Sequence, residues 1–265
     1  MSTTETDGVP YALDNDEVTA GSVLDYLAKI WDPFTQTRLR AAGLTKGTTA
    51  WVAAAGKGTI AHWLAAQGAW VTATDVNPKH IDPHAQISIL TRNDELEPAP
   101  RPGFGLIHAR CALAHWPTRE AVVKKMEQAL IPGGALVIED WGDWSGWVLT
   151  SPVPDAAGIY ARYQAALLEV FRAAGNDPTW AGRTADAMTT AGLEDVSVAT
   201  RAESWRGGTA GCMLPVAVAR ELRDKLLAVG ATAEDLDALP DVMTNRGTLL
   251  LGNMSFSTIG YRPEL

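Results

Sequence analysis

The sequence predicts an α/β fold in which helices cover both faces of a doubly wound, mostly parallel sheet. Short apolar runs of strand length alternate with helical patterns from Thr49 to Asp140, the order typical of such sheets. Turn-forming Gly, Pro and Asp residues separate these runs. With 265 residues, of which 46% are hydrophobic and 20% charged, the chain can bury one large core.

The first half of the chain alternates between the two kinds of pattern. Two helical patterns occupy residues 19–44. Strands are expected at 49–55, 69–74, 87–90, 104–109 and 135–138. A helix over 59–67 ends at Gly68, and a helix over 118–130 ends at the Pro-Gly-Gly sequence 132–134.

The second half adds further helices and two more strands. Helices are expected at 155–174, up to Ala191, at 216–229 and at 233–239, with strands at 196–200 and 254–261. The later helices can cap the sheet. Because there is no repeat and no low-complexity linker, we expect one domain over 1–265, with an N-terminal helical segment (10–45), a core (46–150) and a region of cap helices and closing strands (151–265).

Charge and cysteine content exclude several classes of protein. The net charge is −9 and no basic run occurs, so a phosphate backbone would be repelled and nucleic acid is not expected as a partner. Cys111 and Cys212 lie far apart, which fits a reduced, cytoplasmic setting. The first residues are polar and acidic, unlike a signal peptide, and no apolar run approaches the roughly 20 residues that span a bilayer. No metal is expected, since His80 and His84 lack partners in metal-binding spacing.

The turn after the first strand is the most informative segment for function. In open α/β sheets, ligands bind at the carboxyl ends of the strands, and Gly56 and Gly58 would let the backbone approach a ligand there. A tight turn without a ligand is the alternative. Asp75 ends the second strand, where a carboxylate can accept both hydroxyls of a ribose. Alternatively it caps a helix, because Asn77 and Pro78 follow.

Three stretches of the chain resemble a known family. They read AAAGKGTIAHWLAAQGAWVTATDVNP, FGLIHARCALAHWP and ALIPGGALVIED. Together, and in this spacing, they resemble the class I S-adenosylmethionine (SAM) dependent methyltransferases, especially small-molecule enzymes of actinobacterial metabolism. YALDN, WDPFTQTRLRAAGL and ESWRGGT extend the similarity to most of the chain. The resemblance implies a seven-stranded, Rossmann-like methyltransferase fold with an antiparallel final hairpin. It also implies SAM as cofactor and methylation of a small aromatic or heteroaromatic molecule in secondary metabolism.

The resemblance also assigns residues to the cofactor. The turn after the first strand and the end of the fourth strand would flank the methionine part of SAM. The end of the second strand would bind the ribose, and the segment after the third strand would lie near the adenine. These residues are Ala54, Gly56, Gly58, Asp75, Val76, Asn93, Asp94, Ala109 and Arg110. Two positions depart from the family pattern: Val52 stands where an acid is usual, and Ala54 replaces the first glycine. The departures keep two alternatives open, a cyclase-like enzyme of this fold and a non-catalytic homologous subunit.

Several residues are expected on the acceptor side. His115 follows the fourth strand, where it can act as a base; alternatively it bonds to backbone in its turn. Trp141, Trp144 and Trp147 follow the fifth strand and can wall an aromatic acceptor, or else form a helical stripe over the core. We favour Trp144, and expect Tyr11 as a lid contact by resemblance only.

The acids Glu139, Asp140 and Asp143 either bind a cationic acceptor or are solvated. The expected partner is a small-molecule substrate, with no nucleic acid and no membrane. The sequence leaves the oligomeric state open, with a homodimer as one option.

Overall fold

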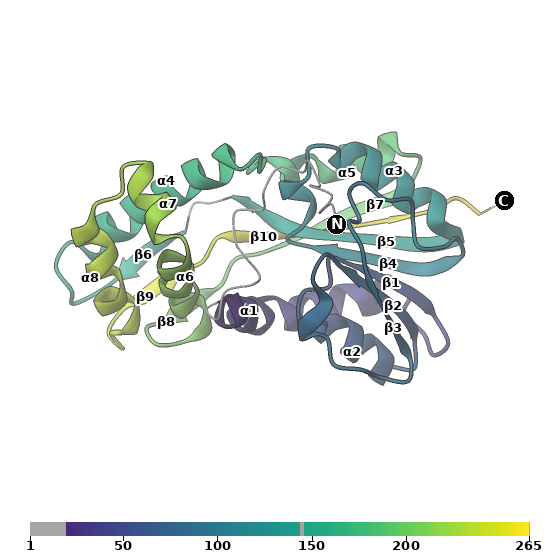
Figure 1. Ribbon diagram of the computed structural model, residues 1–265, viewed down its shortest axis with the longest axis horizontal. Coiled ribbons are helices and arrows are strands. Elements are labelled where there is room, and N and C mark those ends of the chain that lie inside the picture. Colours follow the sequence, from purple (N-terminus) through teal and green to yellow (C-terminus); the bar gives the residue numbers. More distant parts are fainter. Residues whose placement is uncertain (1–19, 144–145, 265) are drawn as a thin grey trace, which may run out of the picture.

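The computed structural model describes residues 20–143 and 146–264, and its centre is a seven-stranded sheet (Figure 1). Its strands are β1 (Thr49–Ala53), β2 (Trp70–Asp75), β3 (Ile87–Thr91), β4 (Phe104–Arg110), β5 (Leu130–Asp143), β7 (Glu194–Arg201) and β10 (Met254–Tyr261). Their order is β3-β2-β1-β4-β5-β10-β7, and β10 runs antiparallel to both of its neighbours. The strands from β3 to β5 pair in parallel. The predicted doubly wound sheet with an antiparallel final hairpin is confirmed.

Helices cover the two faces of this sheet. α2 (Thr59–Ala66) and the second half of α1 (Ala20–Ala41) pack on one face, where Leu39 and Leu64 are fully buried. α3 (Arg119–Ala129) and α5 (Trp180–Thr190) pack on the other. The helices thus exclude water from both faces and leave the carboxyl ends of the parallel strands for a ligand.

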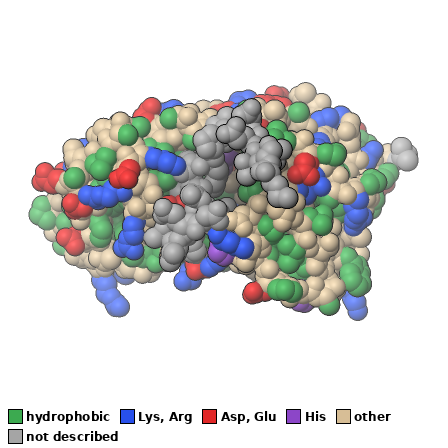
Figure 2. All heavy atoms as spheres, in the orientation of Figure 1, with side chains coloured by type: hydrophobic (Ala, Val, Ile, Leu, Met, Phe, Trp, Pro, Cys, Tyr) green, Lys and Arg blue, Asp and Glu red, His purple; other side chains and the backbone are tan. Residues whose placement is uncertain are grey.

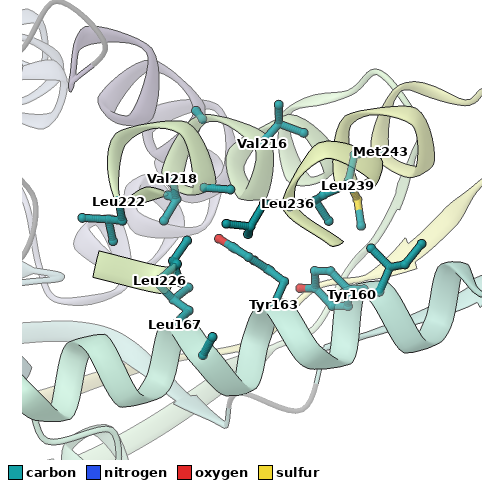
Figure 3. Packing of buried hydrophobic residues seen from close by; sticks show 14 of the residues in the cluster. Tyr160, Tyr163, Leu167, Val216, Val218, Leu222, Leu226, Leu236, Leu239 and Met243 are labelled. Carbon is teal, nitrogen blue, oxygen red and sulfur yellow. The ribbon is translucent and has the colours of Figure 1, made fainter. Parts of the chain in front are cut away.

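The remaining helices form a cap beside the sheet, at the left of Figure 1. They are α4 (Ala156–Ala173), α6 (Ala210–Glu221), α7 (Arg223–Ala228) and α8 (Ala233–Thr244). Tyr160 and Tyr163 point from α4 toward α6, α7 and α8 in the shared core (Figure 3). The cap was expected to be helical, but it also holds a small antiparallel sheet, β6 (Trp147–Thr150), β9 (Leu249–Leu251) and β8 (Ser204–Arg206).

Two predicted elements differ in extent. α1 is a single helix that continues through Pro33, whereas two helical patterns were expected. A proline inside a helix costs about 3 kcal/mol, but Trp31 and Leu39 on either side of it are fully buried, and their packing outweighs that loss. β5 is longer than predicted because β10 pairs with it from Ala135 to Asp143.

The long β5 also decides between the two interpretations of the tryptophans. Trp141 lies on β5 and Trp147 on β6, so the expected alternative of a helical stripe is wrong. Trp144 and Tyr11 lie outside the described residues. Among the described helices, none is both long and apolar enough to cross a membrane. The division of the chain into domains stays a prediction.

Candidate active site

The turn between β1 and α2 has an unusual backbone. Ala54, Gly56 and Gly58 all have positive φ angles, of 47°, 56° and 71°. An L-residue pays roughly 1–2 kcal/mol in this region, whereas glycine does not. Ala54 therefore adopts the conformation that the glycine usual at this place favours. Its N–H donates to Asp94 Oδ2 at 3.1 Å, and the Gly56 N–H donates to Asp75 Oδ2 at 2.9 Å.

Asp75 lies at the end of β2 and is 6% exposed. Its Oδ2 accepts from Gly56, and its Oδ1 accepts from the Asn77 N–H, also at 2.9 Å. The Asn77 bond stabilises the turn but is not the helix cap left open as an alternative, because the short 3₁₀ helix Pro78–His80 has Asn77 at its N-cap position and no side-chain cap bond. A carboxylate offers about four acceptor positions, so these two bonds leave room for ligand hydroxyls.

Asp94, after β3, is 3% exposed and holds the turn from the other side. Its Oδ2 also accepts from Thr74 Oγ1 at 2.5 Å, and its Oδ1 accepts from Arg92 Nε at 3.0 Å. Burial raises the pKa of Asp94 above its usual range, although the bonds from Thr74 and the Ala54 N–H oppose this. The carboxylate thus already has three protein partners before any ligand arrives.

A cavity of about 510 Å³ opens beside this turn, at the carboxyl ends of β1, β2 and β4. Leu24, Leu27 and Ala28 of α1 line its opposite wall. Of the predicted cofactor and catalytic residues, the following line it: Ala54, Gly56, Asp75, Val76, Asn93, Asp94, Arg110 and His115. Gly58 and Ala109 do not. A Cβ on Gly58 would lie 2.7 Å from Ile81 Cγ2, so this glycine permits close packing, and Ala109 is buried in the core.

Most residues that line the cavity fall in a part of the chain that matches a known family; the exceptions are Leu24, Leu27, Ala28 and Ala174. Residues 52–138 match the family model of a methyltransferase domain. The similarity to this domain family covers 87 of the 265 residues, 52 to 138. The match includes β1, the turn, Asp75 and β4, and it confirms the resemblance to class I SAM-dependent methyltransferases that the sequence motifs indicated.

Solved structures share the fold of most of this chain. Phosphoethanolamine N-methyltransferase 2 of Haemonchus contortus, in complex with phosphomonomethylethanolamine and S-adenosylhomocysteine (SAH), is 14% identical with a TM-score of 0.60, over 97% of this chain and 60% of that one. An Anabaena variabilis protein named as a methyltransferase from an antibiotic biosynthesis pathway is 15% identical with a TM-score of 0.56, over 85% and 96%. The Haemonchus enzyme is also solved with SAM. No curated protein matches the sequence.

His115 lies within the matched residues and contacts the cap helix α4. It ends a short 3₁₀ turn, Leu113–His115, and its Nδ1 lies 3.0 Å from Asn176 Nδ2. Its ring packs edge-on against Phe171 of α4, with centroids 5.9 Å apart. Burial, together with the positive charge of Arg119, lowers the pKa of His115 to about 4, so the ring is neutral near pH 7. Asn176 is a side-chain partner of His115 that sequence reasoning missed.

A second, smaller cavity of about 90 Å³ lies between α1, α4, α6 and the small sheet. Its wall is rich in aromatic rings: Trp141, Tyr160, Tyr163, Phe171 and Trp205. Leu27 of α1 lines both cavities, so the two are neighbours. Trp141 therefore belongs to the second cavity, where its ring lies 5.5 Å from that of Trp31.

Only neutral polar groups accompany these rings. Gln164 donates to Tyr160 Oη at 3.1 Å and to Asn253 Oδ1 at 2.6 Å. No charged side chain lines the second cavity in the part of the chain that the structure describes. An ion buried here would lack a counter-charge, so the wall favours a neutral molecule.

A buried polar network adjoins the large cavity at the ends of β4 and β5. Arg110 Nη1 donates to Asp32 Oδ1 and Thr35 Oγ1, each at 2.9 Å. Thr35 Oγ1 in turn donates to Glu139 Oε2 at 2.5 Å, and His108 Nε2 lies 3.1 Å from the same oxygen. The sequence marked this strand end through Ala109 and Arg110, but nothing in the spacing assigns a role to the side chain of His108.

Two of the acids on β5 are buried and not solvated. Glu139 is fully buried and Asp140 is 6% exposed, so the solvated alternative is wrong for both, while the side chain of Asp143 lies outside the description. Burial raises the pKa of Asp140 to about 7, despite a bond from the Ala114 N–H. In the described residues, no group of three or more His, Cys, Asp or Glu side chains is placed to hold a metal ion.

Proposed function

We propose that the protein transfers a methyl group from SAM to a small, neutral, aromatic or heteroaromatic molecule. The observation that carries this proposal is the pair of neighbouring cavities on either side of Leu27, one bordered by the β1–α2 turn and Asp75, the other by aromatic rings. The first offers polar groups for a nucleoside and an amino acid. The second offers an uncharged pocket for an acceptor.

The large cavity suits SAM because its polar and apolar residues could contact the ribose, the adenine and the methionine part in turn. Asp75 would accept the ribose hydroxyls, and Val76 with Asn93 would lie along the adenine. The left-handed turn at Ala54 and Gly56 brings backbone close to the methionine part. Arg110, whose guanidinium lines the cavity, would supply positive charge for the methionine carboxylate.

The small cavity would hold the acceptor. Trp141 on β5 and Phe171 on α4 provide flat apolar surfaces, and the Tyr160 hydroxyl provides a neutral polar contact. Tyr11 and Trp144 stay in the proposal as further acceptor contacts, on the sequence argument alone. Because Leu27 separates the cavities, a small movement of α1 or of that side chain would join them.

The described residues favour catalysis by positioning, with a base available. When bound, SAM supplies a methyl group on a positively charged sulfur. The walls contributed by α1 exclude water from the space between the ligands. His115, neutral and held by Asn176, can accept the proton of an acceptor hydroxyl or amine.

Setting and partners follow from charge and composition. On the face seen in Figure 2, Lys and Arg side chains are interspersed with Asp and Glu, which supports a small molecule over a nucleic acid as substrate. The reduced cysteines support a cytoplasmic location. The fold shared with the Anabaena antibiotic-pathway protein supports a place in secondary metabolism. A homodimer remains one option for the assembly.

The proposal is tested by incubating the purified protein with SAM and a panel of aromatic acceptors, and measuring SAH formed. Neutral acceptors should give SAH, and matched cationic or anionic analogues should give little. Formation of SAH with charged acceptors alone would contradict the proposed acceptor class. SAM binding without SAH formation from any acceptor would favour the cyclase-like enzyme or the non-catalytic subunit.

A further inference from the structure

His108 of β4 and Glu139 of β5 form a buried pair beside the large cavity. The two side chains are 2% and 0% exposed, and His108 Nε2 lies 3.1 Å from Glu139 Oε2. Thr35 Oγ1 donates to the same oxygen at 2.5 Å. His108 itself lines the cavity.

Two atoms of this pair have no hydrogen-bond partner among the described residues. His108 Nδ1 and Glu139 Oε1 are buried and make no hydrogen bond with the described residues. Buried polar atoms are nearly always paired, so each exception calls for an explanation. Among the described side chains with such an atom, His108 alone lines the large cavity, which indicates that a ligand completes it.

The chemistry of the pair selects the ligand group. Burial tends to raise the pKa of Glu139, but the hydrogen bonds from His108 and Thr35 and the charge of Arg110 lower it, so the carboxylate is ionised. In the neutral imidazole, the Nε2–H donates a hydrogen bond to this carboxylate, which leaves Nδ1 as an acceptor. An acceptor backed by a buried negative charge fits a hydrogen-bond donor that carries positive charge.

The strand register places this pair next to Val52, which stands where the family usually has an acid. Val52 on β1 is the direct neighbour of His108 on β4, and both line the cavity. We propose that His108, backed by Glu139, receives the ammonium group of the methionine part of the cofactor, in place of an acid at position 52. This inference rests on the proposed use of SAM.

The test compares two ligands by calorimetry: SAH, and the SAH analogue in which hydrogen replaces the α-amino group. The wild-type protein should bind SAH about 10- to 100-fold more tightly, the scale of one hydrogen bond to a charged group. His108→Ala should bind both ligands with nearly equal affinity. His84→Ala, which removes an exposed imidazole outside the cavity, should keep the wild-type ratio.

A wild-type ratio in His108→Ala would overturn the inference. If that variant does not fold, as judged by thermal unfolding, the isosteric Glu139→Gln replaces it and its ratio should fall several-fold; an unchanged ratio there would overturn the inference equally. Equal affinity of the wild type for both ligands would overturn this inference but leave the proposed function standing. Failure of the wild type to bind either ligand would defeat the proposed function as well.

Discussion

Replacing Asp75 with Asn should weaken both the turn and the binding of the cofactor. The carboxylate accepts the Gly56 and Asn77 N–H groups through different oxygens, and an amide keeps only one acceptor oxygen. Losing one bond to a charged acceptor costs roughly 1.5–3 kcal/mol. For a chain of this size, that loss should lower the melting temperature by roughly 3–12 °C. If Asp75 also accepts the ribose hydroxyls, affinity for SAH should fall by about 10- to 100-fold.

Two measurements on the same samples separate these effects. Thermal unfolding without ligand reports on the turn, and calorimetric titration with SAH reports on the ribose. Asp82→Asn, which alters an exposed acid in the following connection, should change neither. A variant of Asp75 that unfolds at lower temperature but binds SAH as the wild type does would refute the ribose role. It would reduce Asp75 to a turn-capping residue.

Four further outcomes are expected. His115→Ala should slow turnover by roughly 10²–10⁴-fold if the ring acts as a base, whereas a loss below about tenfold would mean catalysis by positioning alone. Burial and the charge of Arg119 lower the pKa of His115 to about 4, so the ring is already neutral near pH 7. The pH profile of kcat/KM should therefore show no inflection from this residue between about pH 5.5 and 8. An inflection in this range that His115→Ala abolishes would contradict the prediction. Trp141→Ala should raise the KM of the acceptor and leave the affinity for SAH unchanged. The matched control is Trp147→Ala, which removes a half-exposed ring. An equal loss of affinity for SAH in Trp141→Ala would contradict the assignment of Trp141 to the acceptor cavity. Ala54→Gly should raise the free energy of unfolding by about 0.5–1 kcal/mol, because glycine adopts the positive φ without strain. The control Ala53→Gly in β1 should lower the free energy of unfolding, and chemical denaturation measures both changes. A loss of stability in Ala54→Gly would count against backbone strain at this residue.

Local patterns were sufficient to predict the sheet and part of the site. The strand–turn–helix order from Thr49 to Asp140 depends on short-range periodicity, and it gave the central strands with errors of a few residues. Asp75 and Gly56 were found because the carboxyl ends of parallel strands are recognisable from the sequence. The resemblance added Val76 and Asn93, which local patterns do not mark.

Features that depend on distant packing could not be predicted. The His108–Glu139 pair joins residues 31 positions apart and exists only in the register of β4 against β5. Asn176 meets His115 across 61 positions, through the connection of the cap to the sheet. The continuous helix through Pro33 is likewise a tertiary result, because the buried residues on both sides of the proline decide it.

Calorimetric titration of the purified protein with SAH tests the central claim most directly, because it asks whether the large cavity is a cofactor site despite Val52 and Ala54. The account predicts binding at one site per chain with a micromolar dissociation constant. It also predicts that SAM competes for the same site. Absence of binding of both SAM and SAH at millimolar concentration, by a protein that unfolds cooperatively, would contradict the account.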